Sequence, residues 1–443
     1  MNNDGEAENV QLTIDNEQFT IMEGWKEISL NKIGWFKGAG VNKLVNSDEQ
    51  PVYLVNYMDV YKNWRVYYNT NYQEVTAKDR ELEEANLFEG DVLFTPSSEK
   101  PIDIGHAGVV METMPNCVYS YHLIRLRLYD KTQFDLKFLS YLLNYDDVQK
   151  HFVSRASGSG IRYTLSLNDF KSAKIKFPEK HEQTAIANIL SKVDEAIAAV
   201  QGSIAAAERL KKSLMQNLLT GRMKPDGTLR KEDEFYMDEK FGKVPKGWEV
   251  KRIDEIAERK TEVIDPTKTK EVYDYIGLEH IIPDEFTRCG KGLSNETVAL
   301  KVKFEKGDLL YGKLRPYLNK VFISDISGVG STEFIVLKQN EFTNWVYLNF
   351  QLQRFLDYTK SMTAGTQHPR ASWKDIKHYL ICIPKDNQEK ESIENKLLSL
   401  EQQKKSKQQK IAILERLKKS LMQNLLTGRV RVKEHPKNKN SKQ

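Results

Sequence analysis

The sequence predicts two copies of a mixed α/β (α+β) domain, separated by two long antiparallel coiled-coil helices and related by a pseudo-two-fold internal repeat. The segment ERLKKSLMQNLLTGR occupies 208–222 and occurs again, letter for letter, at 415–429. A period of 207 residues indicates a duplicated domain, since solenoid repeats are 20–50 residues long. Strand-like runs precede each copy, and an apolar period of three and four residues leads into it.

Composition places the chain among ordinary soluble proteins of two or three domains. It has 443 residues, 40% apolar and 29% charged, without the roughly 20 consecutive apolar residues of a membrane span. Residues 1–22 are acidic, the opposite of a signal peptide's basic start. The three cysteines, Cys117, Cys289 and Cys382, lie far apart, so neither zinc nor disulfides are indicated. A cytoplasmic location is expected.

The net charge of +5 carries little information because the basic tail accounts for it. The last 15 residues hold six Lys or Arg against one Glu. We expect a disordered, solvated end, with a phosphate-contacting arm as the alternative.

Weaker echoes extend the duplication upstream of each identical segment. Gly24-Trp25 answers Gly247-Trp248, Gly90-Asp91 answers Gly307-Asp308, and Ser166 to Phe170 answers Ser372 to Ile376. Each half also contains a helix candidate, near 135–153 and 344–359. The expected parts are an acidic segment 1–22, a first domain 23–178, a helix 179–222, a linker 223–244, a second domain 245–384, a helix 385–429 and the tail 430–443.

The two helices carry the apolar seam of a coiled coil. Each should stop at the glycine of LLTGR, Gly221 or Gly428. A helix of about 60 Å must pack on more than its own domain, and its duplicate is the nearest candidate, in an antiparallel pair. A hairpin that merely holds the two domains together remains open. The seam residues are Ile186, Leu190, Val193, Ile197, Val200, Ile204, Ala207, Leu214 and Leu218, then Ile393, Leu397, Leu400, Ile411, Leu414, Leu421 and Leu425.

Packing alone does not explain why the two copies are identical. A core tolerates many apolar substitutions, yet polar residues of the segment also recur. We take these as a surface on which one kind of partner docks twice. The candidate residues are Lys211, Gln216, Lys418 and Gln423.

With this organisation, the chain resembles the specificity subunits of type I restriction-modification systems over nearly its full length. The resemblance rests on FGKVPKGWEV at 241–250, KGDLLYGKLRPYLNKV at 306–321 and the helices ending in LLTGR. It departs at the N-terminus, where an acidic segment precedes a degenerate MEGW.

The resemblance implies two target-recognition domains that read a bipartite, asymmetric DNA target. It also implies that the helices recruit two adenine-methyltransferase (modification) subunits, together with restriction/translocase subunits. S-adenosylmethionine, ATP and magnesium would then act on those partners, and this chain would bind no cofactor or metal.

Residue types suited to base and phosphate contact gather in four segments. For 62–73, an edge strand with exposed aromatics is as good an interpretation as DNA contact. The segments at 154–164 and 363–372 occupy equivalent places but differ in sequence, as two different half-sites would require. The candidates are Lys62, Asn63, Arg65, Tyr67, Arg155, Ser157, Ser159, Arg162 and Tyr163 in the first half. In the second they are Lys313, Arg315, Tyr317, Lys320, Thr366, Gln367, His368 and Arg370.

No catalytic motif is found. An N-P-P-[YF]-like motif, a phosphate-binding G-x-x-x-x-G-K-[ST], H-E-x-x-H and G-x-S-x-G are all missing from the sequence. The first hypothesis is therefore a non-catalytic DNA-reading adaptor. The alternatives are a two-domain coiled-coil scaffold without DNA specificity, and an enzyme with an unfamiliar active site.

Overall fold

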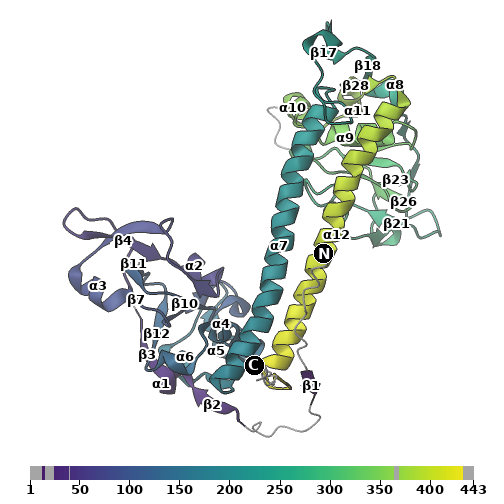
Figure 1. The fold of residues 1–443 in the computed structure, drawn as a ribbon. Coiled ribbons are helices and arrows are strands. Elements are labelled where there is room, and N and C mark those ends of the chain that lie inside the picture. The colour runs from purple at the N-terminus through teal and green to yellow at the C-terminus, as the bar shows by residue number, and fades with distance from the viewer. Residues whose placement is uncertain (1–11, 15–23, 39, 364–368, 433–443) are drawn as a thin grey trace, which may run out of the picture. The chain divides into compact units, whose positions relative to one another are not determined.

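The computed structural model describes residues 12–14, 24–38, 40–363 and 369–432. They form two compact units. Unit 1 comprises Met1–Gln201 with Lys410–Gln443, and unit 2 comprises Gly202–Gln409. Each unit holds one globular domain and a stretch of both long helices (Figure 1). The expected fold class, a mixed α/β domain present twice with two long helices, is confirmed.

Domain 1, in unit 1, is built on two sheets, with the main apolar core between the larger sheet, its helices and the ends of the long helices. A third pairing, β2 (Lys26–Ser29) with β15 (Lys174–Phe177), closes the domain where the long helix begins. The five-stranded sheet has the order β3 (Gly34–Lys37), β12 (Ile124–Leu128), β8 (Val92–Phe94), β10 (Ala107–Val110), β5 (Arg65–Val66). The four-stranded sheet has the order β6 (Gln73–Ala77), β4 (Gln50–Val55), β11 (Met114–Tyr119), β7 (Asn86–Leu87). The helices are α1 (Leu30–Ile33), α2 (Tyr57–Tyr61), α3 (Asp79–Ala85), α4 (Leu136–Leu143), α5 (Asp146–Arg155) and α6 (Leu167–Ser172).

Domain 2, in unit 2, repeats this plan. The pairing of β18 (Trp248–Arg252) with β28 (Leu380–Pro384) corresponds to β2 with β15. One sheet has the order β19 (Arg259–Lys260), β27 (Phe334–Leu337), β24 (Leu309–Gly312), β25 (Val321–Ile323). The other has the order β20 (Val263–Ile264), β23 (Lys301–Phe304), β26 (Gly328–Ser331), β21 (Asp274–Ile276), β22 (Gly292–Leu293). The helices are α8 (Ile253–Ile256), α9 (Thr343–Phe350), α10 (Gln353–Met362) and α11 (Trp373–Ile376).

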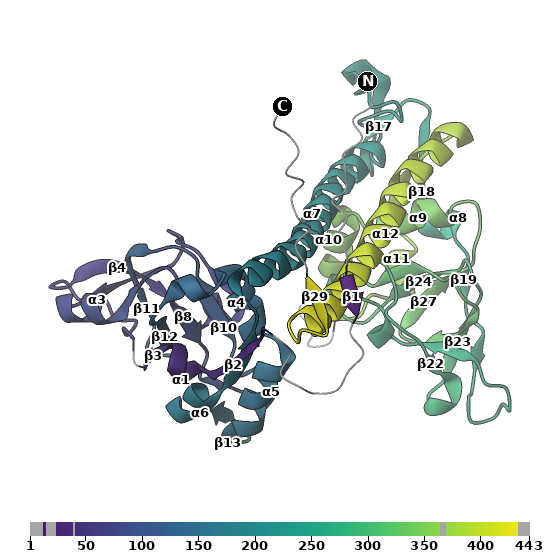
Figure 2. The ribbon, with the colours of Figure 1, turned by 60° about the horizontal axis from the view of Figure 1, so that its bottom comes forward.

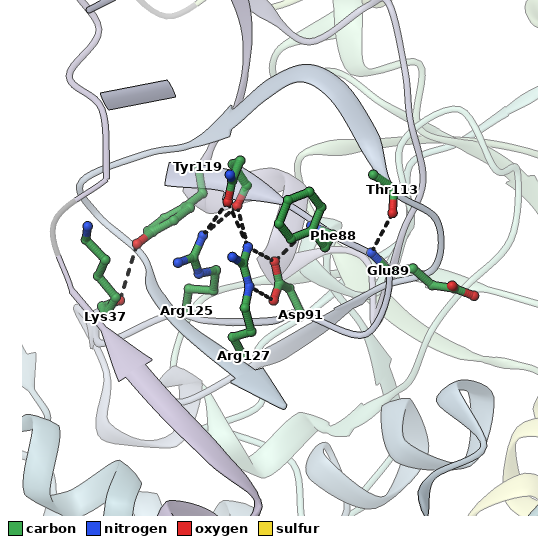
Figure 3. Close-up of polar contacts among 9 residues, drawn as sticks. Lys37, Phe88, Glu89, Asp91, Thr113, Tyr119, Arg125 and Arg127 are labelled. Carbon is green, nitrogen blue, oxygen red and sulfur yellow. Dashed lines mark hydrogen bonds and ion pairs between the residues drawn. The ribbon is translucent and has the colours of Figure 1, made fainter. Parts of the chain in front are cut away.

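The repeated Gly-Asp pair closes the tight turn that leads into the central strand of each domain. Asp91 Oδ2 accepts from the backbone N–H of Phe88 at 2.9 Å, and Asp308 Oδ2 accepts from that of Glu305 at 2.7 Å. In domain 1 the buried Asp91 also binds Arg127, and the nearby Arg125 is buried beside Tyr119 (Figure 3). The guanidinium carbon of Arg125 also lies 5.0 Å from the ring centroid of Trp35. This motif is therefore structural, because a buried carboxylate needs such partners.

The prediction of one helix over 135–153 is wrong, because the structure has two helices there, α4 and α5. Asn144 lies at the break, where its side-chain amide accepts from the N–H of Ala107 at 3.0 Å and donates to the Ala107 carbonyl at 2.7 Å. The backbone of β10 thus forms hydrogen bonds with the Asn144 side chain at the point where α4 ends. The candidate at 344–359 is divided in the same way into α9 and α10.

The long helices α7 (Lys180–Leu218) and α12 (Asn387–Leu425) are paired within each unit, and each pairing is antiparallel. In unit 1, Lys418 Nζ lies 2.7 Å from Asp194 Oδ1 and Arg431 binds Glu182. In unit 2, Lys407 donates to Ser203 Oγ at 2.7 Å and Lys404 Nζ lies 2.7 Å from Glu208 Oε1. Lys404 and Lys407 of α12, which interrupt the apolar seam at the positions one period after Ile197 and Val200, thus have polar partners on α7. None of the described helices is apolar over a stretch long enough to cross a membrane.

The tail expected to be disordered from residue 430 begins instead with a strand. β29 (Val430–Val432) pairs antiparallel with β1 (Leu12–Ile14), as Figure 2 shows. In the linker, Met223 forms the corresponding bridge with Leu229, and Val430 lies one repeat period after Met223. Each unit therefore has one such pairing just after a long helix ends. In unit 1 its two strands lie far apart in the sequence, near residues 12 and 432.

Candidate nucleic-acid interface

Platform 1 is a small exposed sheet at the edge of domain 1, made of residues 96–98 and 157–165. β14 (Arg162–Thr164) pairs with β13 (Ser157–Ser159) on one side and with β9 (Ser97–Ser98) on the other. The Leu165 N–H donates to the Pro96 carbonyl at 2.9 Å, and Arg162 Nη2 donates to Ser97 Oγ at 2.8 Å. The ribbon β13–β14 is thereby fixed to the chain that leaves the central strand β8.

Platform 2 occupies the same place in domain 2 and consists of residues 313–315 and 369–371. The Ala371 N–H donates to the Lys313 carbonyl at 3.0 Å, and the Arg315 N–H donates to the Pro369 carbonyl at 2.8 Å. Pro96 and Lys313 each lie five residues after the aspartate of the Gly-Asp turn. The two domains therefore build one type of platform from different side chains.

Platform 2 rests on unusual backbone. Arg315 has φ 51° and Asn319 has φ 41°, on either side of a 3-10 turn at Pro316–Leu318. Non-glycine residues seldom adopt such angles, and they do so mostly where surrounding structure enforces them. The consequence is that Arg315 and Tyr317 are exposed at the platform.

Cationic side chains lie at both platforms: Arg162 in platform 1, with Lys43 close to it, and Lys313, Arg315 and Arg370 in platform 2. His122 faces Lys43 and Arg162; burial, followed by these two charges, lowers the pKa of His122. Burial likewise lowers the pKa of Lys313; Glu333 opposes that shift, and Arg259 and Arg370 add to it. Clustered cations of this kind suit a phosphate backbone.

The segment 62–73 does not join platform 1. β5 is the edge strand of its sheet, as the alternative interpretation had it, and Lys62, Asn63 and Tyr67 are exposed there. Arg65 instead turns toward α7: its Nη2 lies 3.6 Å from Asp194 Oδ2 and its Nε donates to Ser140 Oγ at 3.1 Å. A DNA contact by Arg65 would have to replace these partners.

The other predicted DNA-reading residues are mostly at the platforms. Arg155 is exposed at the end of α5, and Ser157, Ser159 and Tyr163 lie on the ribbon of platform 1. In domain 2, Arg370 is exposed and lies 3.2 Å from Glu333 Oε1, whereas Lys320 donates to the Leu278 carbonyl at 2.6 Å. Thr366, Gln367 and His368 lie outside the described residues. Whether any of these residues contacts bases stays a prediction.

Sequence reasoning missed two residues of platform 1, Ser97 and Ser98, and two residues near its Arg162, Lys43 and His122. The first two could have been found, because they follow the Gly-Asp motif at the spacing of Lys313 to Arg315. Lys43 and His122 come close only through the fold, and no local pattern indicated them.

The docking residues taken from the repeat divide into two kinds. Gln216 and Gln423 are exposed, as expected. Lys211 and Lys418 are not the free surface lysines that were expected, because each forms an ion pair across the helix pair, with Glu401 and Asp194 respectively. The step of 3.5 residues through Ala207, Leu214 and Leu218 places Lys211 in the seam, and this could have been predicted.

Among the described residues, no group of three or more His, Cys, Asp or Glu side chains is arranged to hold a metal ion. The platforms contain hydrogen-bonding and cationic side chains on exposed backbone. Such side chains suit binding to a nucleic acid. They fit a class of DNA-reading proteins with two reading domains.

Comparison with known proteins identifies that class. The model of the family described as type I restriction modification DNA specificity domain matches residues 22–209 and 245–421, so the chain belongs to this family and contains its domain twice. It is similar to the EcoDI specificity subunit of Escherichia coli, with 25% identity over 271 residues, 55% of this chain and 58% of that one. It is also similar to the MjaVIII specificity subunit of Methanocaldococcus jannaschii, with 22% identity over 380 residues, 82% of this chain and 83% of that one.

The crystal structure of the M. genitalium S subunit has the same fold, with a TM-score of 0.55 at 15% identity, covering 96% of this chain and 100% of that chain. The chain is thus a DNA-specificity subunit with two recognition domains. The resemblance seen in the sequence is confirmed, as is the assignment to a specificity subunit rather than a catalytic one.

Proposed function

We propose that this subunit reads an asymmetric, two-part DNA target, with platform 1 on one half-site and platform 2 on the other. The observation that carries this is the same platform built twice with different side chains. Arg, Ser and Tyr on a two-stranded ribbon suit a major groove, which is wide enough to admit such a ribbon. The helix pair that each domain packs on would then set the gap between the half-sites.

We further propose that two modification subunits, with adenine-methyltransferase activity, dock on the identical segments of α7 and α12. Their exposed side chains recur at both sites and include a leucine, Leu210 at 51% and Leu417 at 45% exposure. A surface of apolar and hydrogen-bonding residues repeated with this fidelity fits one partner bound twice. The repeated exposed residues include Arg209, Leu210, Lys212, Ser213 and Gln216, then Arg416, Leu417, Lys419, Ser420 and Gln423.

Restriction/translocase subunits would join through this assembly in the cytoplasm. S-adenosylmethionine, ATP and magnesium would act on the partner subunits, in keeping with a chain whose platforms offer contacts to DNA. A scaffold without DNA specificity is not favoured, because both domains match a DNA-specificity family.

Mapping methylated adenines in a host genome tests the proposal. Arg162→Gln should relax the sequence requirement of one half-site and leave the other intact, and Arg315→Asn should do the reverse. Asparagine is chosen at 315 because it tolerates the left-handed backbone. Arg80→Ala, an exposed arginine on α3 of domain 1, is the matched control and should leave both half-sites unchanged. Unaltered half-sites in both platform variants would contradict the proposal.

A further inference from the structure

Each identical segment places one lysine, Lys211 or Lys418, into a cluster that joins both long helices to a recognition domain. The two clusters are built from corresponding residues. Each contains an acid on one helix, the repeated lysine on the other, and a tyrosine from the domain.

Anchor cluster 1 lies in unit 1 and centres on Asp194 of α7. Lys418 of α12 lies 2.7 Å from one carboxylate oxygen, and the Tyr141 hydroxyl of α4 donates to the other at 2.5 Å. Lys418 Nζ also lies 4.6 Å from the ring centroid of Trp64, a residue beside the edge strand β5. Burial, followed by the hydrogen bond to Asp194, raises the pKa of Tyr141 to about 12, so the hydroxyl keeps its proton at neutral pH.

Anchor cluster 2 lies in unit 2 and centres on Glu401 of α12. Lys211 of α7 binds this carboxylate and donates to Gln351 Oε1 at 2.7 Å, and the Tyr347 hydroxyl of α9 donates to Glu401 at 2.9 Å. The Phe286 ring takes the place of Trp64, with its centroid 5.1 Å from Lys211 Nζ. Burial raises the pKa of Tyr347 well above its usual value.

The correspondence follows the repeat. Asp194 and Glu401 are one period apart, as are Lys211 and Lys418. The aromatic residues differ in origin, since Trp64 lies beside a strand and Phe286 on a loop. The same arrangement of acid, lysine and tyrosine thus joins the helix pair to two different domains.

We propose that the anchor clusters are positioning devices, which fix the angle of each recognition domain on the helix pair and so restrict the gap between half-sites. This rests on the proposed two-part reading of DNA. The acid, lysine and tyrosine bridge three elements through charge-assisted hydrogen bonds, which are strong and directional. Removal of one member takes one partner from the groups that remain, so the domain gains freedom to tilt.

The test uses the full chain assembled with its modification subunits and a panel of duplexes. Each duplex carries both half-sites at the natural gap, or at a gap one base pair shorter or longer. In Lys418→Ala, the preference for the natural gap should fall roughly tenfold, as for the loss of one charge-assisted hydrogen bond. Tyr141→Phe, which keeps the ring, should weaken that preference in the same direction, and Lys418→Arg should restore part of it.

Lys410→Ala is the matched control, because it removes an exposed lysine of the same helix outside the identical segment and should keep the wild-type preference. Thermal unfolding shows that each variant is folded. A wild-type gap preference in folded Lys418→Ala and Tyr141→Phe would overturn the inference. So would loss of one modification subunit from Lys418→Ala alone, since that would make Lys418 a docking residue. If the wild-type complex showed no half-site preference at all, the proposed function itself would fail.

Discussion

At the scale of residues, a carboxylate near the start of each long helix is paired with an arginine from another segment. Glu182 is 3% exposed, and both its oxygens accept from Arg431 of β29 at 2.8 Å. Glu389, one period later, binds Arg230 and accepts from Trp248 Nε1 at 3.2 Å. Acids in the first turn favour the helix dipole, and the arginines connect each helix start to the segment that closes the unit.

Replacing Arg431 should therefore destabilise unit 1. Arg431→Met leaves Glu182 buried without its cation, which typically costs about 3–5 kcal/mol of unfolding free energy. Denaturant unfolding measures this, with the exposed Arg429→Met as the control, for which we expect a change under about 0.5 kcal/mol. A similar loss in both variants would show that the buried pair contributes nothing specific.

A second buried carboxyl makes stability depend on pH. Burial in unit 2 raises the pKa of Glu394 to about 7. Between the usual value of 4.5 and 7, the folded chain binds a proton that the unfolded chain releases, so stability falls as pH rises through this window. Glu394→Gln mimics the protonated form; its melting temperature should match the wild type at pH 4.5 and exceed it at pH 8.5. An equal difference at both pH values would contradict the assignment.

At the scale of elements, α7 shows glycine in two opposite settings. Gly221, just past the helix end, has φ 68°, and a Cβ there would lie 2.2 Å from Pro245 Cγ. Gly202, inside the helix, is exposed and a Cβ would meet nothing within 4 Å. The first glycine is required by geometry, whereas the second only weakens the helix.

The two alanine substitutions should therefore have opposite signs. Gly202→Ala should stabilise the chain by about 0.5–1 kcal/mol, and Gly221→Ala should destabilise it by more than about 1 kcal/mol. Thermal unfolding of both variants under identical conditions decides the question. Two effects of the same sign would show that helix propensity and end geometry have been misjudged.

The sequence predicted the elements that depend on local patterns. Apolar spacing located the long helices. The repeated Ser-x-x-Asp was recognised only as part of the duplication, and the structure shows that it begins two short helices, α6 and α11, capped by Ser166 and Ser372. Sequence reasoning missed features that depend on residues far apart in the sequence. These are the break between α4 and α5 at Asn144, whose side chain binds the backbone of Ala107, and the pairing of residues 96–98 with 163–165. The DNA-reading candidates were found by residue type, so Arg65 was included although Asp194 holds it against α7.

At the scale of the whole molecule, each of the two units contains one strand pairing next to the end of a long helix. The turn that joins Met223 to Leu229 in unit 2 is replaced in unit 1 by β29 and β1. A circular permutant that joins residue 443 to residue 1 and opens between Asp226 and Gly227 should keep these pairings. We expect its melting temperature to stay within a few degrees of the wild type and its half-sites to be unchanged. A much lower melting temperature or altered half-sites would show that the order of the elements along the chain is itself required.

We propose that the paired helices hold the two reading domains at a set separation. The most direct test inserts one helical turn into α7 between Val200 and Ile204, with a matching turn in α12 near Lys407, which contacts Ser203. The inserted turn adds about 5.4 Å, against about 3.4 Å for each base pair. Methylation mapping should return the same two half-sites with a gap one or two base pairs longer. Recovery of the original gap would contradict the account.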